Sequence, residues 1–433
     1  MVSAVTRRDS IHEGPGHSLA LLQIRYLQSG DHALVYRALC AALVGRGGEV
    51  DWSTFTADDW SLYEQMAYGE RVNHLLCAAW TDQLWPPAVP RPIRLRLVAR
   101  FVLAQVAQRA LFQELADRVL AALAPVVEPV VLLKGGALAP MLYPSLALRP
   151  MSDVDILVRP EQLAQAVRQL EASGCVESAP GMGMAQSPVT GYHVRLTCQS
   201  PVPLTVEVHQ SVLAATDGAG ADMAWFWTQL EPMALHDSHG AVRACHMLSP
   251  TANLLHLSAH LMLHHGEAQA TLLQFYDLHL LVERWGGRVN WQEAVRHADE
   301  MEWTPALWAA MRGCADRLGT RWPEGSLAAL TRRASARTAH MVHQKAQPQA
   351  TTVATLVWLA LKSLSWPARA QWLGELVFPR PAYLRWRYRP NPAWLWPLCY
   401  LVRWGRGIRH AWHTLWPMAR GADASRRSHI KSG

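Results

Sequence analysis

Two aspartates placed two residues apart are the first feature of this sequence that suggests chemistry. Asp153 and Asp155 lie in the alternating segment 153–158, whose remaining positions are apolar. Alternate residues of a β-strand point to the same face, so both carboxylates are expected on one face and the apolar side chains on the other.

A third acid, Glu207, lies in a second alternating segment, residues 205–209. If the two strands pair, three carboxylates converge, and they repel one another unless one takes up a proton or a cation binds. Hard cations such as Mg²⁺ or Mn²⁺ prefer oxygen ligands, and clustered acids can hold two metals for displacement at phosphorus. We therefore predict Asp153, Asp155 and Glu207 as metal ligands and catalytic residues. His209 follows on the same face and is a candidate base or partner of a metal ligand.

The turn at residues 134–136, Lys-Gly-Gly, suggests a phosphate-binding site. It ends the apolar run 130–133, which is predicted to be a buried strand, and it precedes a segment that can form a helix. Glycines allow backbone N–H groups to approach an anion, and a helix N-terminus favours negative charge. The predicted nucleotide- and phosphate-binding residues are Lys134, Gly135, Gly136, Arg149 and Ser152.

Each fragment alone is a weak motif, and their order along the chain carries the interpretation. The relevant segments are Leu132–Gly135 with Leu138 and Tyr143, then Arg149 and Ser152–Val158, then Val206–His209. Together they resemble the uncharacterised nucleotidyltransferase family of the polymerase-β superfamily. The similarity covers about residues 20–320 and includes flanking segments around Asp59-Trp60, His256–His264, Tyr276–Leu278 and Asn290-Trp291.

The resemblance implies an α+β fold, with a small mixed-sheet nucleotidyltransferase core between helical N-terminal and C-terminal regions. It also implies Mg²⁺ on Asp153, Asp155 and Glu207 and an NTP as donor substrate. Lys134 and Gly135 stand where most of the superfamily has a Gly-Ser turn, so Lys134 or Ser152 would have to replace the serine contact to phosphate.

Four regions are expected along the chain. Apolar residues recur at helical spacing before residue 124, including Ser18–Leu27 and a long helix at about 95–123, and again after residue 250. Short alternating segments at 175–177, 192–197 and 204–209 complete the sheet. The predicted divisions are a helical region at 1–124, the nucleotidyltransferase core at 125–235, a helical domain at 236–366 and a Trp/Arg-rich tail at 367–433.

Histidines recur every four residues at His256, His260 and His264, with His265 beside them. Imidazoles at this spacing share a helix face, and two of them can hold a transition metal. The glutamate of the HExxH pattern is absent, which excludes that metalloprotease motif. The favoured interpretation is structural, with these histidines bonded to carbonyl groups or to Asp277.

Charge and composition restrict the other possibilities. The chain of 433 residues has a formal charge of +7, but from Arg380 onward eleven basic residues face one acid, so the remainder is about −3. No apolar run approaches the roughly 18–20 residues that span a bilayer. The seven cysteines include no CxxC pair, which argues against a zinc ribbon and, as isolated thiols, favours a reducing cytoplasm.

The basic tail allows more than one partner. Apolar residues from Leu401 to Trp416 share one arc of a predicted helix, and arginines and histidines share the other. Such a helix suits an anionic membrane surface or nucleic acid. The favoured interpretation is that its tryptophans pack on the protein's own helical domain.

The predicted reaction is transfer of an NMP from an NTP to a hydroxyl-bearing acceptor with release of pyrophosphate. The acceptor is a small molecule, a sugar, a peptide side chain or RNA. Two alternatives stay open, a phosphotransferase that uses the same metal site and a catalytically silent nucleotide-binding scaffold.

Overall fold

The structure is a computed structural model of the whole chain. It describes residues 30–83, 85–178, 192–199, 203–217, 220–326, 330, 336–346, 361, 364–407 and 409. The predicted helix at Ser18–Leu27 and the end of the tail beyond residue 409 lie outside these ranges.

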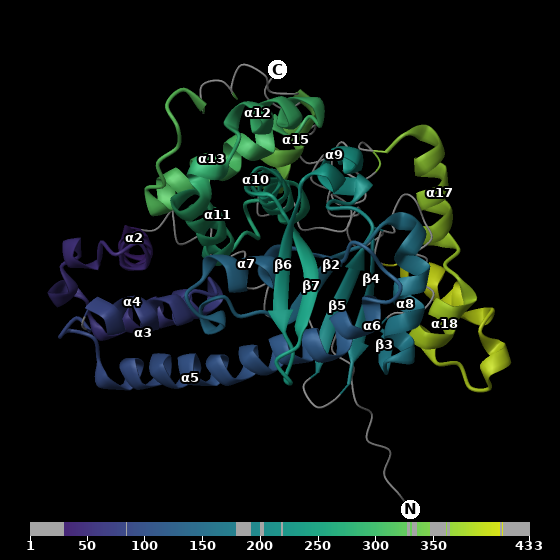
Figure 1. Cartoon of the computed structure of the whole chain (residues 1–433), viewed down its shortest axis with the longest axis horizontal. Helices are drawn as coiled ribbons and strands as arrows, with labels where there is room; N and C mark the ends of the chain where they lie inside the picture. Colours follow the sequence, from purple (N-terminus) through teal and green to yellow (C-terminus); the bar gives the residue numbers. More distant parts are fainter. Residues whose placement is uncertain are drawn as a thin grey trace, which may run out of the picture.

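A mixed β-sheet forms the centre of the protein, with helices around it (Figure 1). In the described part of the chain it has seven strands in the order β3-β4-β5-β2-β1-β7-β6. The strands are β1 (Val131–Leu132), β2 (Asp153–Leu157), β3 (Cys175–Glu177), β4 (His193–Cys198), β5 (Leu204–His209), β6 (Leu230–His236) and β7 (Val242–Leu248). The predicted α+β class, a small mixed sheet with helical flanks, is confirmed.

The central strands β2 and β5 run parallel, and their register places Asp155 beside Glu207. A parallel pair requires a crossover connection, which here contains α8 (Leu163–Ala172) and the strands β3 and β4. The buried positions of α8, Leu163, Ala166 and Leu170, give it an apolar face that packs on β5 and β3. The polar residues of the strands therefore lie on the opposite face of the sheet.

The sheet extends beyond the predicted core boundary at residue 235. Strands β6 and β7 form an antiparallel hairpin, and β7 pairs in parallel with β1. The expectation of a wholly helical region from 236 onward is therefore wrong for residues up to 248. Pro232 lies within β6, and a proline normally argues against a strand unless the strand lies at a sheet edge, as β6 does.

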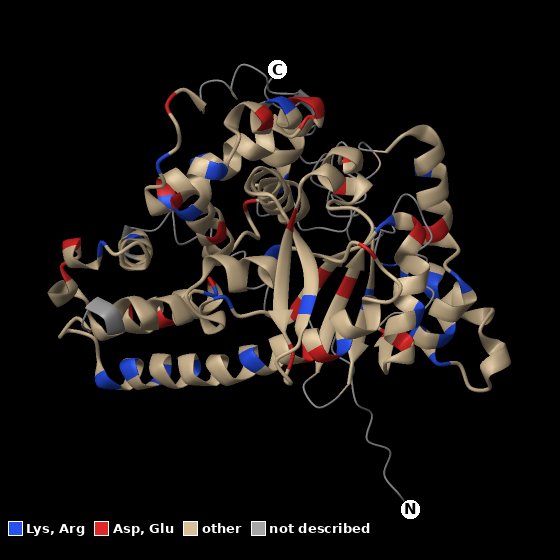
Figure 2. Cartoon of the chain, in the orientation of Figure 1, with Lys and Arg blue, Asp and Glu red and all other residues tan. Residues whose placement is uncertain are grey.

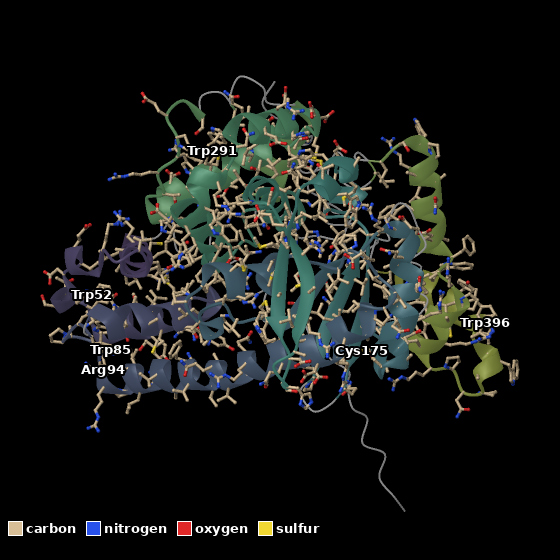
Figure 3. The ribbon with its side chains drawn as sticks, viewed as in Figure 1. Trp52, Trp85, Arg94, Cys175, Trp291 and Trp396 are labelled. Carbon is tan, nitrogen blue, oxygen red and sulfur yellow. A yellow bond between two sulfur atoms is a disulfide. The ribbon has the colours of Figure 1, made fainter. Side chains whose placement is uncertain are left out.

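Helices before the sheet form an N-terminal layer built around aromatic rings. They are α2 (Gly30–Leu43), α3 (Ala57–Gly69), α4 (Asn73–Gln83) and α5 (Arg91–Glu114), which continues through a π-helical turn into α6 (Ala121–Leu123). Trp52, Trp60, Tyr63 and Trp80 contact one another with ring centroids 5.6–5.8 Å apart. Trp52 is labelled in this layer in Figure 3. Aromatic packing of this kind closes the layer against solvent.

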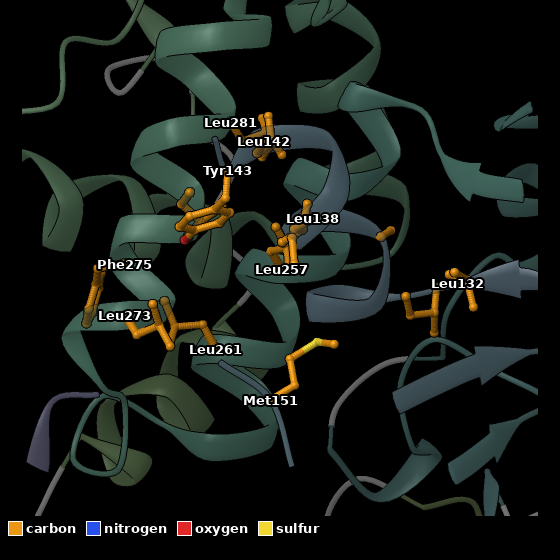
Figure 4. Packing of buried hydrophobic residues seen from close by; sticks show 14 of the residues in the cluster. Leu132, Leu138, Leu142, Tyr143, Met151, Leu257, Leu261, Leu273, Phe275 and Leu281 are labelled. Carbon is orange, nitrogen blue, oxygen red and sulfur yellow. The ribbon is translucent and has the colours of Figure 1, made fainter. Parts of the chain in front are cut away.

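A second helical layer consists of one helix just before the hairpin of β6 and β7 and of helices that follow the hairpin. It contains α9 (Met223–Thr228), α10 (Pro250–Ala259), α11 (Leu272–Trp285), α12 (Trp291–Glu300), α13 (Thr304–Leu318) and α15 (Ala336–Lys345). The helix α7 (Lys134–Leu142), which follows β1, buries Leu138 and Leu142 beside Leu257 of α10 and Leu281 of α11 (Figure 4). Glu70, after α3, accepts hydrogen bonds from the backbone N–H groups of Leu272 and Leu273, at 2.6 and 3.2 Å. These contacts connect both helical layers to one another and to the sheet.

The tail forms α17 (Trp366–Val377), α18 (Pro381–Tyr388) and a further helical segment at 398–407, beside α8 in Figure 1. Leu401 is 61% exposed, and Trp404 contacts Phe378 and Tyr400 of the tail itself. Trp404 of the predicted arc thus packs within the tail, and the members of the arc from Ile408 onward lie outside the described residues. No described helix is long and apolar enough to cross a membrane.

Two of the cysteines are paired. Cys175 on β3 and Cys198 on β4 lie opposite one another and form a disulfide, and Cys175 is labelled in Figure 3. The expectation of seven isolated thiols is wrong for this pair, because antiparallel pairing brings together two residues that are 23 positions apart. The other five cysteines are free and buried.

The two glycines of the Lys-Gly-Gly turn yield a matched stability test. A Cβ on Gly135 would overlap Met151 Sδ and lie 2.8 Å from Met151 Cγ, whereas a Cβ on Gly136 would have its nearest neighbour at 3.4 Å. Gln108 holds the backbone of Met151 with two hydrogen bonds of 3.0 Å. Only the side chain of Met151 can therefore move to make room for an added Cβ. We expect Gly135→Ala to lower the free energy of unfolding by about 1–3 kcal/mol. Gly136→Ala should leave it unchanged or raise it by up to about 1 kcal/mol. Urea unfolding with equal midpoints for the two variants would contradict this packing.

Candidate active site

One face of the strands β2, β5 and β4 carries the polar residues of the candidate site. Glu207 in the middle strand has Asp155 beside it on β2 and Arg195 opposite it on β4. His209 and His193 form the next pair along β5 and β4. Because neighbours in register share a face, the sheet alone brings these five side chains together.

Asp155 is the most enclosed of the predicted metal ligands. It accepts a hydrogen bond from Lys134 Nζ at 2.7 Å, and its Oδ1 lies 2.8 Å from His209 Nε2. Burial opposes ionisation of Asp155, but the ammonium and the imidazole hold the pKa of this carboxyl well below its usual range. Asp155 is therefore a fixed negative charge at neutral pH.

Glu207 is held in the same way by a different set of donors. Arg195 Nε donates to Glu207 Oε1 at 2.8 Å, and Nη2 of the same guanidinium also contacts this oxygen. Glu207 Oε2 lies 3.6 Å from His209 Nε2 and 4.0 Å from His193 Nε2. Burial raises the pKa of Glu207, yet these imidazole and guanidinium contacts outweigh it and lower the pKa to about 2. His193 is itself neutral at pH 7, because burial and the nearby cations lower its pKa to about 4.

Asp153 has the least compensated charge of the three acids. The hydroxyl of Ser152 lies 3.4 Å from Asp153 Oδ1, and the nearby carboxylates Asp155 and Glu207 add repulsion. Burial and these two acids raise the pKa of Asp153 above its usual value. A cation at this point would therefore relieve an electrostatic cost that the protein's own groups leave in place.

The donor set fits a hard divalent cation. One donor atom each from Asp155, Glu207 and His209 lie within 4.8 Å of one another, and all three residues are buried. Two carboxylates and one imidazole suit Mg²⁺ or Mn²⁺, the latter tolerating nitrogen more readily. The sequence placed Asp153 in this set. In the structure His209 lies with Asp155 and Glu207 in this group, and Asp153 interacts with the two acids through its charge.

Lys134 aims its ammonium into the site from a strained backbone position. Its φ is +45°, a left-handed conformation that costs an ordinary residue about 1–2 kcal/mol relative to glycine. Gly135 and Gly136 follow it, and both are buried at the start of α7. The N-terminus of α7, with its partial positive charge, therefore lies beside the carboxylates.

Arg149, which was predicted to bind phosphate, is instead paired with an acid. Its guanidinium is buried and donates to both oxygens of Asp277 on α11, at 2.9 Å from Nε and 2.9 Å from Nη2. Tyr143 donates its hydroxyl to the same carboxylate at 2.6 Å. Arg149 thus joins the chain before β2 to the second helical layer. Ser152, by contrast, is exposed next to Asp153.

Three basic residues of this region were missed in the sequence. Arg195 and His193 alternate on β4 in the same pattern as Glu207 and His209 on β5, and this shared alternation was the available signal. Arg71 lies in the turn between α3 and α4, where its charge interacts with Asp153, Asp277 and Arg149. A single arginine 82 positions before Asp153 carries no signal in the sequence.

The histidines after α10 differ from their expected environment. The carboxylate of Asp277 accepts hydrogen bonds from Arg149 and Tyr143, and not from these histidines. His264 Nδ1 lies 2.6 Å from Asp217 Oδ2. His256 is buried, and its ring nitrogens have no partner among the described residues. Burial lowers the pKa of His256 to about 3, so it is a neutral side chain in the wall of the site.

A mixed sheet with clustered carboxylates beside a lysine at a helix N-terminus suits metal-assisted transfer of phosphorus-containing groups. The family model described as uncharacterised nucleotidyltransferase matches residues 56–319, and the chain belongs to this family. The match confirms the resemblance predicted from the motifs. No curated protein and no solved structure shows a significant match to the chain.

The buried pair of Arg149 and Asp277 yields a stability prediction. The Asp277 side chain is 2% exposed, and Asp277→Asn would leave a buried guanidinium without its counter-charge. We expect a loss of about 3–5 kcal/mol in the free energy of unfolding, measured by urea denaturation. The matched control is Asp316→Asn, which breaks an exposed pair with Arg312 on α13 and should cost less than about 1 kcal/mol. Equal losses in the two variants would show that Arg149 does not depend on Asp277.

Proposed function

We propose that the protein transfers an NMP from an NTP to an unidentified hydroxyl-bearing acceptor, with release of pyrophosphate. The observation that carries this proposal is the group formed by Asp155, Glu207 and His209 next to Lys134, in a chain of the nucleotidyltransferase family. Acids buried this close together cost stability unless a cation uses them.

Mg²⁺ or Mn²⁺ is the proposed cofactor, held by Asp155 and Glu207 with Asp153 beside them. When bound, the metal would neutralise charge on the triphosphate and lower the pKa of the acceptor hydroxyl. His209 positions both carboxylates, because its Nε2 lies 2.8 Å from Asp155 and 3.6 Å from Glu207. Glu207, at the centre of the polar face, is the acid assigned to the acceptor side.

The NTP is proposed to lie over the start of α7. Lys134 and the backbone N–H groups of this helix provide positive charge for the phosphates. Ser152 and Arg71 extend this surface past Asp153. Arg149 keeps the backbone before Ser152 in place through Asp277, and we assign it a positioning role and no phosphate contact.

A phosphotransferase would use the same carboxylates, and a silent scaffold would keep the fold without turnover. Parallel reactions with α-labelled and γ-labelled NTPs distinguish the three functions. Label from the α-phosphate on the acceptor, with pyrophosphate as product, supports nucleotidyl transfer. Label from the γ-phosphate with an NDP as product supports the phosphotransferase, and no transfer to any acceptor class supports the scaffold.

Asp155→Asn is the decisive variant. It keeps the size of the side chain but removes the charge that a divalent cation needs, so we expect loss of turnover and of metal-dependent stabilisation. In the unaltered protein, Mg²⁺ or Mn²⁺ at 100 times its dissociation constant should add about 2.7 kcal/mol to the free energy of unfolding. Thermal unfolding with and without the metal measures this shift.

The matched control is Glu177→Gln, which removes an acid from the edge strand β3, away from the three acids. It should keep both turnover and the metal shift. A full metal shift in Asp155→Asn would show that the divalent cation binds elsewhere.

A further inference from the structure

Three histidines gather at the end of α10, outside the carboxylate group. One ring nitrogen each from His260, His264 and His265 lie within 4.8 Å of one another. Their ring centroids are 4.6–5.0 Å apart. His264 and His265 are half-buried, and the close approach of the three imidazoles has a physical reason in the surrounding structure.

The backbone supplies part of that reason. Residues 260–265 form a π-helical turn, in which bonding runs from residue i to i+5. In an α-helix, His264 would lie below His260 and His265 would point away. The wider turn brings both His264 and His265 next to His260, and such turns occur frequently at functional sites.

Neighbouring groups hold this turn in place. Lys345 on α15 donates to the carbonyl groups of Leu263 and His264 and to Asp217 Oδ1 at 3.2 Å. Gly266 ends the turn with φ +78°, and a Cβ there would lie 2.6 Å from the carbonyl oxygen of Lys345. The helix α15 is thus packed directly on the backbone that carries the histidines.

Asp217 also orients one of the three rings. It lies 2.6 Å from His264 Nδ1, so a metal held by this ring would bind through Nε2. A carboxylate behind a histidine is the usual arrangement behind metal-ligating imidazoles. The charge of Asp217 is balanced by Lys345, so the three rings present nitrogen donors without a net acidic charge.

We propose that His260, His264 and His265 form a binding site for a transition metal of the Zn²⁺ or Co²⁺ class, distinct from the carboxylate site. Three imidazoles select such metals over Mg²⁺, which prefers oxygen ligands. A metal with bonds of about 2.0–2.1 Å to nitrogen would draw these donors, which lie within 4.8 Å of one another, closer together. His264 is 31% exposed, which leaves a fourth position open to water or to a substrate atom.

The proposal is tested by metal binding to the full-length protein, independently of turnover. Co²⁺ is titrated into the protein in the presence of excess Mg²⁺, and the visible absorption of four-coordinate Co²⁺ is recorded. In a separate experiment the protein is loaded with Zn²⁺ and dialysed, and the bound Zn²⁺ is measured. We expect one tight equivalent in the unaltered protein and at least a tenfold loss of affinity in His264→Ala and in His265→Ala. Both side chains are partly exposed, so both variants should fold.

Two controls separate this site from its surroundings. His343→Ala removes an exposed histidine of α15 and should bind Co²⁺ as the unaltered protein does. Asp155→Asn should also retain Co²⁺, whatever its effect on turnover, because the two donor sets share no residue. Absence of Co²⁺ binding, or binding that survives in both histidine variants, would overturn the proposal.

A second inference rests on the tail, through different residues. Between Trp366 and Gly407 the chain has seven arginines and one acid, Glu375, and Figure 2 shows several basic positions along the ribbon around α18. Trp366 is 79% and Trp394 72% exposed. Large exposed apolar side chains of this kind indicate a surface that binds a membrane or another molecule.

We infer that residues 366–407 dock on an anionic lipid surface. Arginines contact the aromatic rings, as in Arg369 over Trp366 and Arg385 over Trp396, so positive charge and apolar area occupy the same surface. Trp396 is labelled on this segment in Figure 3. Insertion of tryptophan between headgroups and attraction of arginine to anionic lipid add to one another, and salt weakens only the second.

Co-sedimentation of the full-length protein with vesicles tests this inference. We expect binding to vesicles that contain phosphatidylglycerol, weaker binding at high salt, and a loss of at least fivefold in Trp366→Ser/Trp394→Ser. The matched control, Leu103→Ser/Val106→Ser, changes equally exposed apolar residues of α5 and should bind as the unaltered protein does. Equal sedimentation of the two double variants, or capture by RNA without vesicle binding, would overturn it.

Discussion

The close approach of Asp155 and Glu207 on parallel neighbouring strands is the constraint around which this structure is arranged. Two buried carboxylates in register repel one another, and the sheet cannot separate them without changing its pairing. Positive or hydrogen-bonding groups therefore arrive from three other places: Lys134 from the start of α7, Arg195 from β4, and His209 from the end of β5. Each of these contacts also holds a helix or strand in place, so a change in the charges of the site would alter the packing of the core.

This balance explains why the site tolerates strain. The left-handed backbone at Lys134 would be free of cost for a glycine, yet only a long cationic side chain reaches Asp155 from there. Asp153 is the least compensated of the three acids, because burial and its two acidic neighbours outweigh the nearby positive charges and raise its pKa. Asp155 and Glu207 thus have cationic or imidazole partners within the protein, whereas the nearest hydrogen-bonding group to Asp153 is the hydroxyl of Ser152.

Much of the core was predictable because its signals are local. The central strands were predicted to within one or two residues of their ends. The signals were the alternation at 153–158 and 204–209, the apolar run before Lys134 and the breaks at glycine. The hairpin of β6 and β7 was missed because Pro232 and the weak alternation of 242–248 argue against strands, and only pairing with β1 stabilises them. Arg149 was predicted to bind phosphate because its ion-pair partner, Asp277, lies 128 positions away in the sequence. No local sequence pattern indicates a buried ion pair between such distant residues. His209 was placed correctly on the polar face, but its contact with Asp155 depends on strand register, which sequence alone does not determine.

The contacts of Asp277 and Glu70 have a consequence for how this chain can be divided. Asp277 accepts hydrogen bonds from Arg149 and Tyr143 of the sheet region, and Glu70 accepts the first N–H groups of α11 from across the N-terminal layer. A fragment that contained only the sheet region would keep Arg149 and Tyr143 but lose the carboxylate that accepts their hydrogen bonds. Without the N-terminal layer, α11 would lose its contacts with Glu70. The sheet region therefore depends on both helical layers for these contacts. The segment that matches the family, residues 56–319, contains all of these residues together with their partners.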